Sequence, residues 1–165
     1  MIYKTAIFLF LLTINQSLSA EKIHWGEETF KEILRDEIDQ IYALADTPVV
    51  KAAVVRHNNV GMELEAIKRH DQLWIQGAVQ GLKRNIMSNP AGTFLRKFIT
   101  ADTIFNEAIL TGNQGANVAA YPLTSDYWQG DEDKWKESIK AGGQLHMGAV
   151  KYDESSGVHA IQVSV

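Results

Sequence analysis

A β-hairpin is predicted by residues Ile104–Tyr121, which read IFNEAILTGNQGANVAAY. β-Prone residues fill Ile104–Thr111 and return in Ala116–Tyr121, and the segment between them, Gly112–Gly115, has the composition of a turn. These glycines lie between two strands and do not open a helix, so they indicate a hairpin turn and not a phosphate-binding loop. Antiparallel strands are therefore expected in the second half of the chain.

A second hairpin is predicted near the end of the sequence. Its strands are Gln144–Tyr152 and Val158–Val165, joined by a polar turn at residues 153–157. The sequence stops at Val165 inside the second strand, with no turn, cap or polar tail. A sheet that ended there would have an apolar edge, and such edges pair readily with other strands. Either the sequence is truncated or something else completes the sheet.

Helices are predicted ahead of the hairpins, because apolar residues recur at three- and four-residue steps and because Thr-Pro and Asn-Pro pairs are typical of helix starts. The expected helices are Glu27–Ala45, Pro48–His57, Glu63–Gln76, one starting at Asn89-Pro90, and a short one at Asp131–Lys140 between the hairpins. Helices followed by antiparallel strands predict an α+β fold.

Composition limits the class of protein. The chain has 165 residues, 45% of them hydrophobic, and no Cys. This length suits one domain with a sizeable core, and the absence of Cys excludes a disulfide scaffold or a thiolate metal site. Lys and Arg number 16 against 20 Asp and Glu, a net charge of −4. A mildly acidic chain without a basic run is a poor candidate for nucleic-acid binding.

The N-terminus, Met1–Ala20, has the composition of a secretory signal peptide. Lys4 precedes an apolar stretch, Ala6–Ile14, and the segment ends in small residues. The apolar stretch is shorter than the ~20 residues that cross a bilayer. We expect cleavage after Ala20 and a single domain over 21–165, periplasmic or secreted; the alternative is an uncleaved membrane anchor.

Several segments resemble an extracytoplasmic family, the Cache sensor domains of the PDC type, which are PAS-like modules of bacterial chemoreceptors and sensor kinases. The likeness lies in the hairpin at 105–119, in TSDYWQGDEDKW at Thr124–Trp135, and in the second hairpin at 152–155 and 161–165. The resemblance implies a long N-terminal helix and further helices packed on a central antiparallel sheet of PAS-like topology. It also implies a ligand pocket between that sheet and a lid.

This sequence departs from the family in two respects. Relatives continue with a further strand beyond the point that corresponds to Val165, so the family sheet would lack its last strand here. Most relatives are also tethered to a transmembrane helix and a cytoplasmic output domain, which this sequence does not contain. The Arg of the family motif for free amino acids has no match, so recognition of an amino acid is not implied.

Aromatic and acidic residues gather in the expected lid. Ring faces beside carboxylates suit an amine or a quaternary ammonium, and aromatic rings with a few polar groups suit a neutral polar solute. The alternative is that the tryptophans pack the lid onto the sheet while the acids cap the short helix. The candidate ligand-binding residues are Tyr121, Ser125, Asp126, Tyr127, Trp128, Asp131, Trp135, Tyr152 and Asp153. For Asp153, preference for a turn position is an equally good explanation.

No catalytic, cofactor or metal motif is found in the sequence. His146 and His159 could meet across the second hairpin, but two imidazoles without a third ligand make a poor metal site. We therefore expect a non-catalytic sensor domain without a cofactor, which binds an amine, a carboxylate or another polar solute. A membrane receptor or a second copy would be its partner. One alternative is an interaction module that pairs through the open strand Val158–Val165. The other is a small periplasmic enzyme that uses Asp126 or Asp131.

Overall fold

The computed structural model describes residues 7–14, 31–32, 34–101, 104–153 and 158–165, with only the backbone described at 7–14, 151–153 and 158–159. Its helices are α2 (Arg35–Ala45), α3 (Pro48–Val60), α4 (Leu64–Ile75), α5 (Gln80–Ser88), α6 (Pro90–Ala101) and α7 (Asp133–Lys140). Its strands are β1 (Ile7–Ile14), β2 (Phe105–Thr111), β3 (Asn117–Tyr121), β4 (His146–Met147), β5 (Lys151–Asp153) and β6 (Val158–Ser164). The predicted α+β class is confirmed.

The strands form one antiparallel sheet in the order β3-β2-β1-β6-β4, with β5 also paired to β6. The predicted first hairpin is present as β2 and β3, in which Ala108 lies opposite Tyr121. β1 is the central strand, with Leu9 opposite Ile109 of β2 on one side and Ser164 of β6 on the other. A short apolar segment near the N-terminus therefore joins the two hairpins.

The apolar stretch near the N-terminus forms a strand in the structure. Ile7–Ile14, most of the apolar stretch expected to belong to a signal peptide, forms β1, while the rest of Met1–Ala20 lies outside the described residues. β6 is consequently not an open edge, because β1 pairs on one side of it and β4 and β5 pair on the other. The prediction that Val158–Val165 is an open edge strand is therefore wrong for the described structure, in which this strand is paired on both sides.

The remaining differences concern one helix that was not predicted and one strand that is divided. α5 (Gln80–Ser88) was not expected. The strand expected over Gln144–Tyr152 is two short strands, because the chain leaves the ladder at Gly148, whose N–H still donates to the carbonyl of Gln162 (2.8 Å). The first helix predicted over Glu27–Ala45 is confirmed from Arg35 to Ala45 as α2, and residues 27–30 and 33 lie outside the described part. Within the helices that the structure describes, none has the length and apolarity needed to cross a membrane.

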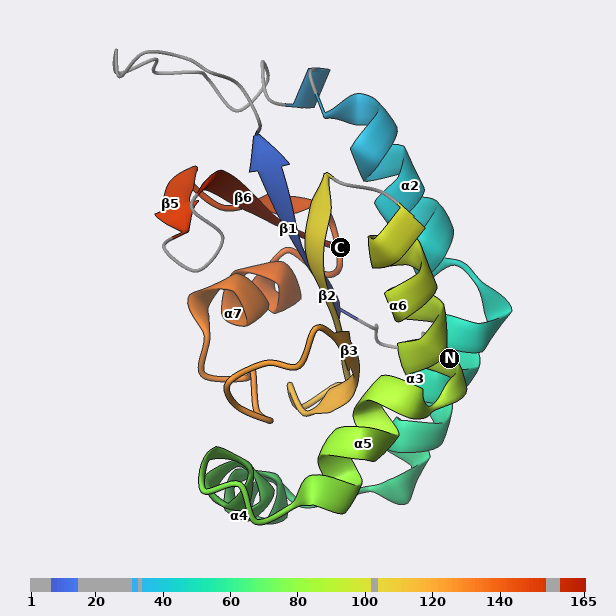
Figure 1. Cartoon of the computed structure of the whole chain (residues 1–165), viewed down its shortest axis with the longest axis vertical. Helices are drawn as coiled ribbons and strands as arrows, with labels where there is room; N and C mark the ends of the chain where they lie inside the picture. Colours follow the sequence, from blue (N-terminus) through green and yellow to red (C-terminus); the bar gives the residue numbers. More distant parts are fainter. Residues whose placement is uncertain (1–6, 15–30, 33, 102–103, 154–157) are drawn as a thin grey trace.

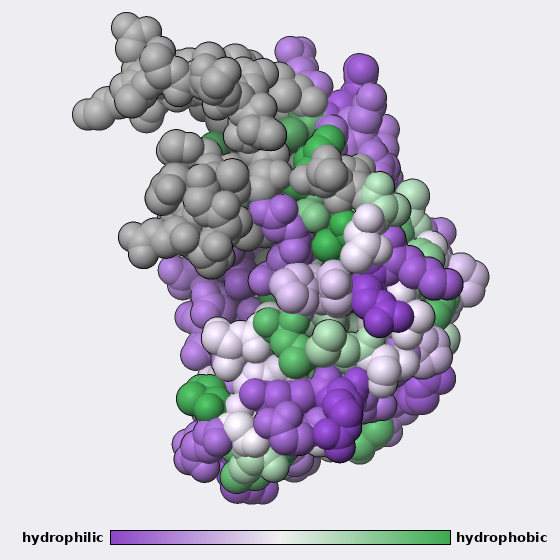
Figure 2. Space-filling view, viewed as in Figure 1, coloured by the Kyte–Doolittle hydropathy of each residue, from purple (hydrophilic) through white to green (hydrophobic). Residues whose placement is uncertain are grey.

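The sheet lies between two layers. Figure 1 shows α2, α3 and α6 along one side of the strands and α7 with its preceding loop on the other. The main core fills the first interface, where α2, α3 and α6 bury Ile41, Val50 and Leu95 against Leu110 and Val163 of the sheet. The space-filling view shows polar residues over the outward end of α2 and scattered hydrophobic patches near α4 and α5 (Figure 2).

The start of α6 is fixed by the Asn-Pro pair that predicted it. The Asn89 side-chain oxygen accepts the N–H of Gly92 at 2.8 Å, which is the expected N-cap bond. Asn89 also donates to the carbonyl of Val118 at 2.9 Å, so the cap ties α6 to β3. Gly92 is needed for close packing, because a Cβ there would lie 2.1 Å from the carbonyl oxygen of Ile86 in α5.

Candidate functional site

The second side of the sheet is covered by the segment from Pro122 to Ala141, here called the lid, which ends in α7. Trp135 of α7 donates from Nε1 to the Thr111 hydroxyl of β2 at 3.3 Å. Ile109, two residues earlier in β2, packs in a second core cluster with Trp74 and Tyr127. Because side chains alternate along a strand, Ile109 and Thr111 mark the sheet face that the lid covers.

The first half of the lid is held by a carboxylate from α4. Asp71 Oδ1 accepts the backbone N–H groups of Tyr127 at 2.7 Å and Trp128 at 3.0 Å. One side-chain oxygen therefore satisfies two successive amides of a loop more than fifty residues away in sequence. Backbone amides in a part-buried loop need such partners, so Asp71 positions the lid.

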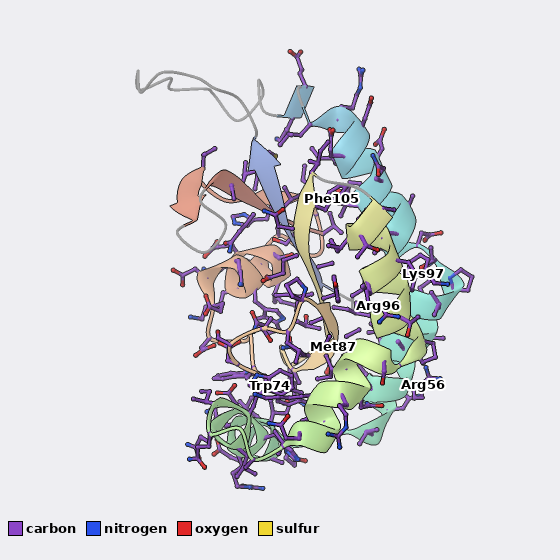
Figure 3. The ribbon with its side chains drawn as sticks, viewed as in Figure 1. Arg56, Trp74, Met87, Arg96, Lys97 and Phe105 are labelled. Atoms are coloured by element: carbon purple, nitrogen blue, oxygen red, sulfur yellow. The ribbon has the colours of Figure 1, made fainter. Side chains whose placement is uncertain are left out.

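An aromatic pair lies beneath this loop. Trp74 is fully buried and Tyr127 is 2% exposed, with ring centroids 5.9 Å apart. Trp74 rises from α4 toward the lid (Figure 3) and donates from Nε1 to the carbonyl of Thr124 at 3.1 Å. Burial raises the pKa of Tyr127 to about 12. Tyr127 is thus a core residue that secures the lid.

Trp128 is fixed against the first hairpin. Its Nε1 donates to the Gln114 carbonyl at 2.8 Å, and Lys68 Nζ lies 5.3 Å from its ring centroid. Gly115 and Gly130 let the two segments touch, because a Cβ on Gly115 would lie 2.5 Å from Gly130 Cα. Gly115 also has a φ of +82°, which disfavours any side chain. The indole is therefore half-buried and held at its edge.

Asp126 lies at the rim of the lid with a raised pKa. Burial is the main cause of the rise, which a hydrogen bond from Gln129 opposes and the charges of Asp71 and Glu132 reinforce. The Lys134 cation opposes it weakly. The acid therefore sits in a region where negative charges outnumber positive ones, so a cationic or hydrogen-bond-donating solute is favoured nearby.

Three buried polar atoms in this layer have no hydrogen-bond partner within the described part of the chain: Asn117 Oδ1, Ser138 Oγ and Ser164 Oγ. Their residues are 2%, 0% and 1% exposed. Asn117 lies opposite Thr111 in the β2–β3 ladder and therefore shares its face. Ser138 lies one helical turn after Trp135, on the inner side of α7.

Ser164 belongs to the same face by register. It lies across β1 from Ile109, since both are opposite Leu9, and His146 of β4 is its partner on the other side. Residues directly opposite each other in a ladder point to the same side of the sheet. The unpartnered atoms of Asn117, Ser138 and Ser164 thus all belong to the layer between sheet and lid.

The structure brings together only some of the predicted ligand-binding residues. Tyr127, Trp128 and Trp135 lie in or against the second cluster, and Asp126 accepts a hydrogen bond from Gln129 in the same loop, whereas Ser125 and Asp131 are exposed to solvent. Tyr121 packs against the main core on the opposite sheet face. Tyr152 and Asp153 are in β5, which pairs with β6. The side chains of these two residues and of His159 are not among those that the structure describes.

Sequence reasoning missed Asp71, Trp74, Asn117, Ser138 and Ser164. A signal for Asp71 and Trp74 was present in the sequence. Their spacing from Ile67, in steps of four and three, puts the Asp71 carboxylate on the apolar face of α4, where a charged residue is unexpected. Across the residues that the structure describes, no group of three or more His, Cys, Asp or Glu is arranged to hold a metal ion. No family model matches this chain, and neither curated proteins nor solved structures yield a match.

Proposed function

We propose that this protein is a secreted or periplasmic sensor domain that binds a small polar solute between the sheet and the lid, without catalysis. The observation that carries the proposal is the set of three buried, unpartnered atoms on Asn117, Ser138 and Ser164. Buried polar groups in folded proteins nearly always have a partner, so each of these atoms calls for one. β2 and β1 separate β3 from β6, so Asn117 and Ser164 lie about 14 Å apart, and a small solute would partner Ser138 and Ser164, or Asn117, but not all three.

The donor set favours one class of solute. An amide oxygen only accepts, and a serine hydroxyl can accept or donate, so the complementary molecule carries hydrogen-bond donors. The acids around Asp126 add a preference for a neutral or cationic group. An amine or a polyol is therefore favoured over a carboxylate. An antiparallel sheet with helices on one face and α7 with the lid on the other is compatible with a PAS-like architecture and supports the Cache resemblance.

The lid divides into a fixed half and a responsive half. Residues 124–130 are tied to α4 and to the first hairpin through Asp71, Trp74 and Gln114. α7 has the hydrogen bond from Trp135 to Thr111, and after its C-cap at Ala141 the chain continues through Gly142 and Gly143, both with positive φ. A solute that contacts Ser138 would therefore act on α7, which is where a shift between two arrangements would begin.

A thermal-shift screen across amines, polyols, carboxylates and nucleobases tests the proposal. A binding solute should raise the melting temperature, most strongly among amines or polyols. Ser164→Ala and Ser138→Ala should weaken its binding about tenfold while leaving the free protein equally stable, since they remove hydroxyls that have no partner. Ser88→Ala is the matched control, because Ser88 is exposed on α5. A screen without any stabilising compound, or unchanged binding in both buried variants, would refute the proposal.

A further inference from the structure

Charge is divided unevenly among the helices. The stretches 47–62 and 72–101, which include α3, α5 and α6, contain no Asp or Glu. They carry six cations: Lys51, Arg56, Lys83, Arg84, Arg96 and Lys97. Residues 35–46, which are α2 and its C-cap, instead carry the cation Arg35 and four acids: Asp36, Glu37, Asp39 and Asp46. The helices of this acidic chain therefore have a basic part and an acidic part.

The basic part includes exposed cations on two helices that pack against each other. Arg56 of α3 and Arg96 and Lys97 of α6 are exposed, and none of them forms an ion pair within the part of the chain that the structure describes. Figure 3 labels all three on the helical side of the sheet, where α3 contacts α6. Val55, next to Arg56, is 40% exposed. We call Val55, Arg56, Arg96 and Lys97 the basic face.

The acidic part lies along the outward side of α2. Asp36, Asp39 and Asp46 follow at steps of three and seven, so they share one side of the helix, and all three are exposed. Tyr42 lies at the flank of this side and is 43% exposed. Asp46 forms an ion pair with Lys51 of α3, which marks where the acidic and basic parts meet. We call Asp36, Asp39 and Tyr42 the acidic face.

These two faces are complementary to each other under a two-fold rotation. When patches of opposite charge lie side by side, a half-turn about an axis between them places each patch on the opposite patch of a second copy. In this chain the axis would pass near the pair of Lys51 and Asp46, between α2 and α3. Every attraction then occurs twice, and like charges are kept apart. Arg and Tyr, which both faces expose between them, are also enriched at protein interfaces.

Other anionic partners match only one of the two faces. Figure 1 shows α2, α3 and α6 along the same side of the strands. An anionic membrane or a nucleic acid would attract the basic face but repel the acids of α2 on that side, and the whole chain has a net charge of −4. A second copy of the chain uses both faces, so the charges favour it.

We propose that this protein forms a symmetric dimer in which the acidic face of each copy contacts the basic face of the other. Tyr42 and Val55 add apolar area to each of the two contacts. The charged side chains are exposed, so the dimer is weak and sensitive to salt. The proposal does not depend on the proposed solute site, which belongs to the opposite face of the sheet, under the lid.

Sedimentation equilibrium of the full chain tests the dimer. Between about 0.05 M and 0.5 M NaCl the dissociation constant should rise at least about tenfold. Two charge-reversed variants locate the contact: Arg56→Glu with Lys97→Glu on the basic face, and Asp36→Lys with Asp39→Lys on the acidic face. All four side chains are exposed, so both variants should remain folded by circular dichroism. Each variant alone should associate at least about tenfold more weakly.

Mixing the two variants distinguishes the proposed contact from a general effect of charge. An equimolar mixture, or a chain with all four changes, should associate as tightly as the unmodified protein, because opposite charges face each other again. The matched control is Lys136→Glu with Lys140→Glu. It makes the same change in net charge on exposed cations of α7, on the other side of the sheet, and should leave the dimer intact.

Three sedimentation results would overturn the proposal: a monomer at low salt, no association in the mixture, or equal weakening by the control. A monomer that binds vesicles of anionic lipid, and loses this binding in Arg56→Glu with Lys97→Glu, would overturn it as well, because the basic face would then contact a membrane. None of these results depends on whether a solute binds under the lid.

Discussion

The two hydrogen bonds that lid amides donate to Asp71 give the most direct test of how α4 holds the lid. Asp71→Ala removes the acceptor of the Tyr127 and Trp128 N–H groups, which lie 2.7 and 3.0 Å from Oδ1. Each part-buried amide without a partner costs about 1–3 kcal/mol, so we expect the free energy of unfolding to fall by about 3 kcal/mol. Asp71→Asn keeps an accepting oxygen without its charge and should cost about 1 kcal/mol.

Chemical denaturation measures the loss of stability, and amide hydrogen exchange locates it. Protection should fall at least about tenfold at Tyr127 and Trp128 in Asp71→Ala, and far less at the core strands. Asp71→Asn should also lower the pKa of Asp126, because the charge of Asp71 contributes to its rise. Asp131→Ala is the matched control, since that side chain is exposed in the same lid. Equal stability of Asp71→Ala and Asp71→Asn, or unchanged exchange at both amides, would refute the reasoning.

Two further predictions concern Tyr127 and the helix glycines. Burial places the pKa of Tyr127 at about 12 against an ordinary 10.0, so the unfolded chain loses this proton first and stability should fall by about 2–3 kcal/mol between pH 10 and pH 12. Tyr127→Phe should remove that part of the alkaline decline in denaturation curves, and an unchanged decline would contradict the assignment. Gly92→Ala should destabilise the protein by about 1–3 kcal/mol because its Cβ would meet the Ile86 carbonyl at 2.1 Å. Gly81→Ala, with open space around it in α5, should instead stabilise by about 0.5–1 kcal/mol; similar melting shifts for both alanines would show that packing does not decide the difference.

Local signals in the sequence predicted the elements whose boundaries are set locally. The Asn-Pro pair at 89–90 predicted the start of α6, and its cap bond is present. α5 has no such signal: its sequence QGLKRNIMS includes a glycine, lacks a side-chain cap and buries only Ile86. It is held by packing on α6, where Gly92 allows the close approach, and tertiary contacts of this kind are not visible in a local pattern.

The segment Ile7–Ile14 shows the limit of reading apolar runs. A short run of apolar residues is typical of a signal peptide and equally of a strand that is buried on both faces. Composition does not separate the two, because both require only that every side chain avoid water. That this segment pairs with both β2 and β6 is a property of the assembled sheet, and it leaves the signal-peptide prediction untested.

The aromatic residues of the candidate site could be predicted from the sequence, but its buried polar residues could not. Clustering in sequence predicted Trp128 and Trp135, but Asn117, Ser138 and Ser164 come from β3, α7 and β6 and lie in the same layer only in the folded chain. The tryptophans and Tyr127 largely serve to hold the lid through edge hydrogen bonds and core packing. The proposed solute would therefore be bound by small polar side chains, which are too common in sequence to stand out.

The two parts of the lid differ in what they contact, and this limits which part could move when a solute binds. Residues 124–130 are bonded to α4 and to the turn of the first hairpin, so they move only if α4 or the sheet moves. α7 instead packs on β1, β6 and β4, the part of the sheet that depends on the central strand. The proposed solute, bound at Ser138 and Ser164, would then bridge α7 and β6, so its binding would be transmitted first through a shift of α7 against the sheet.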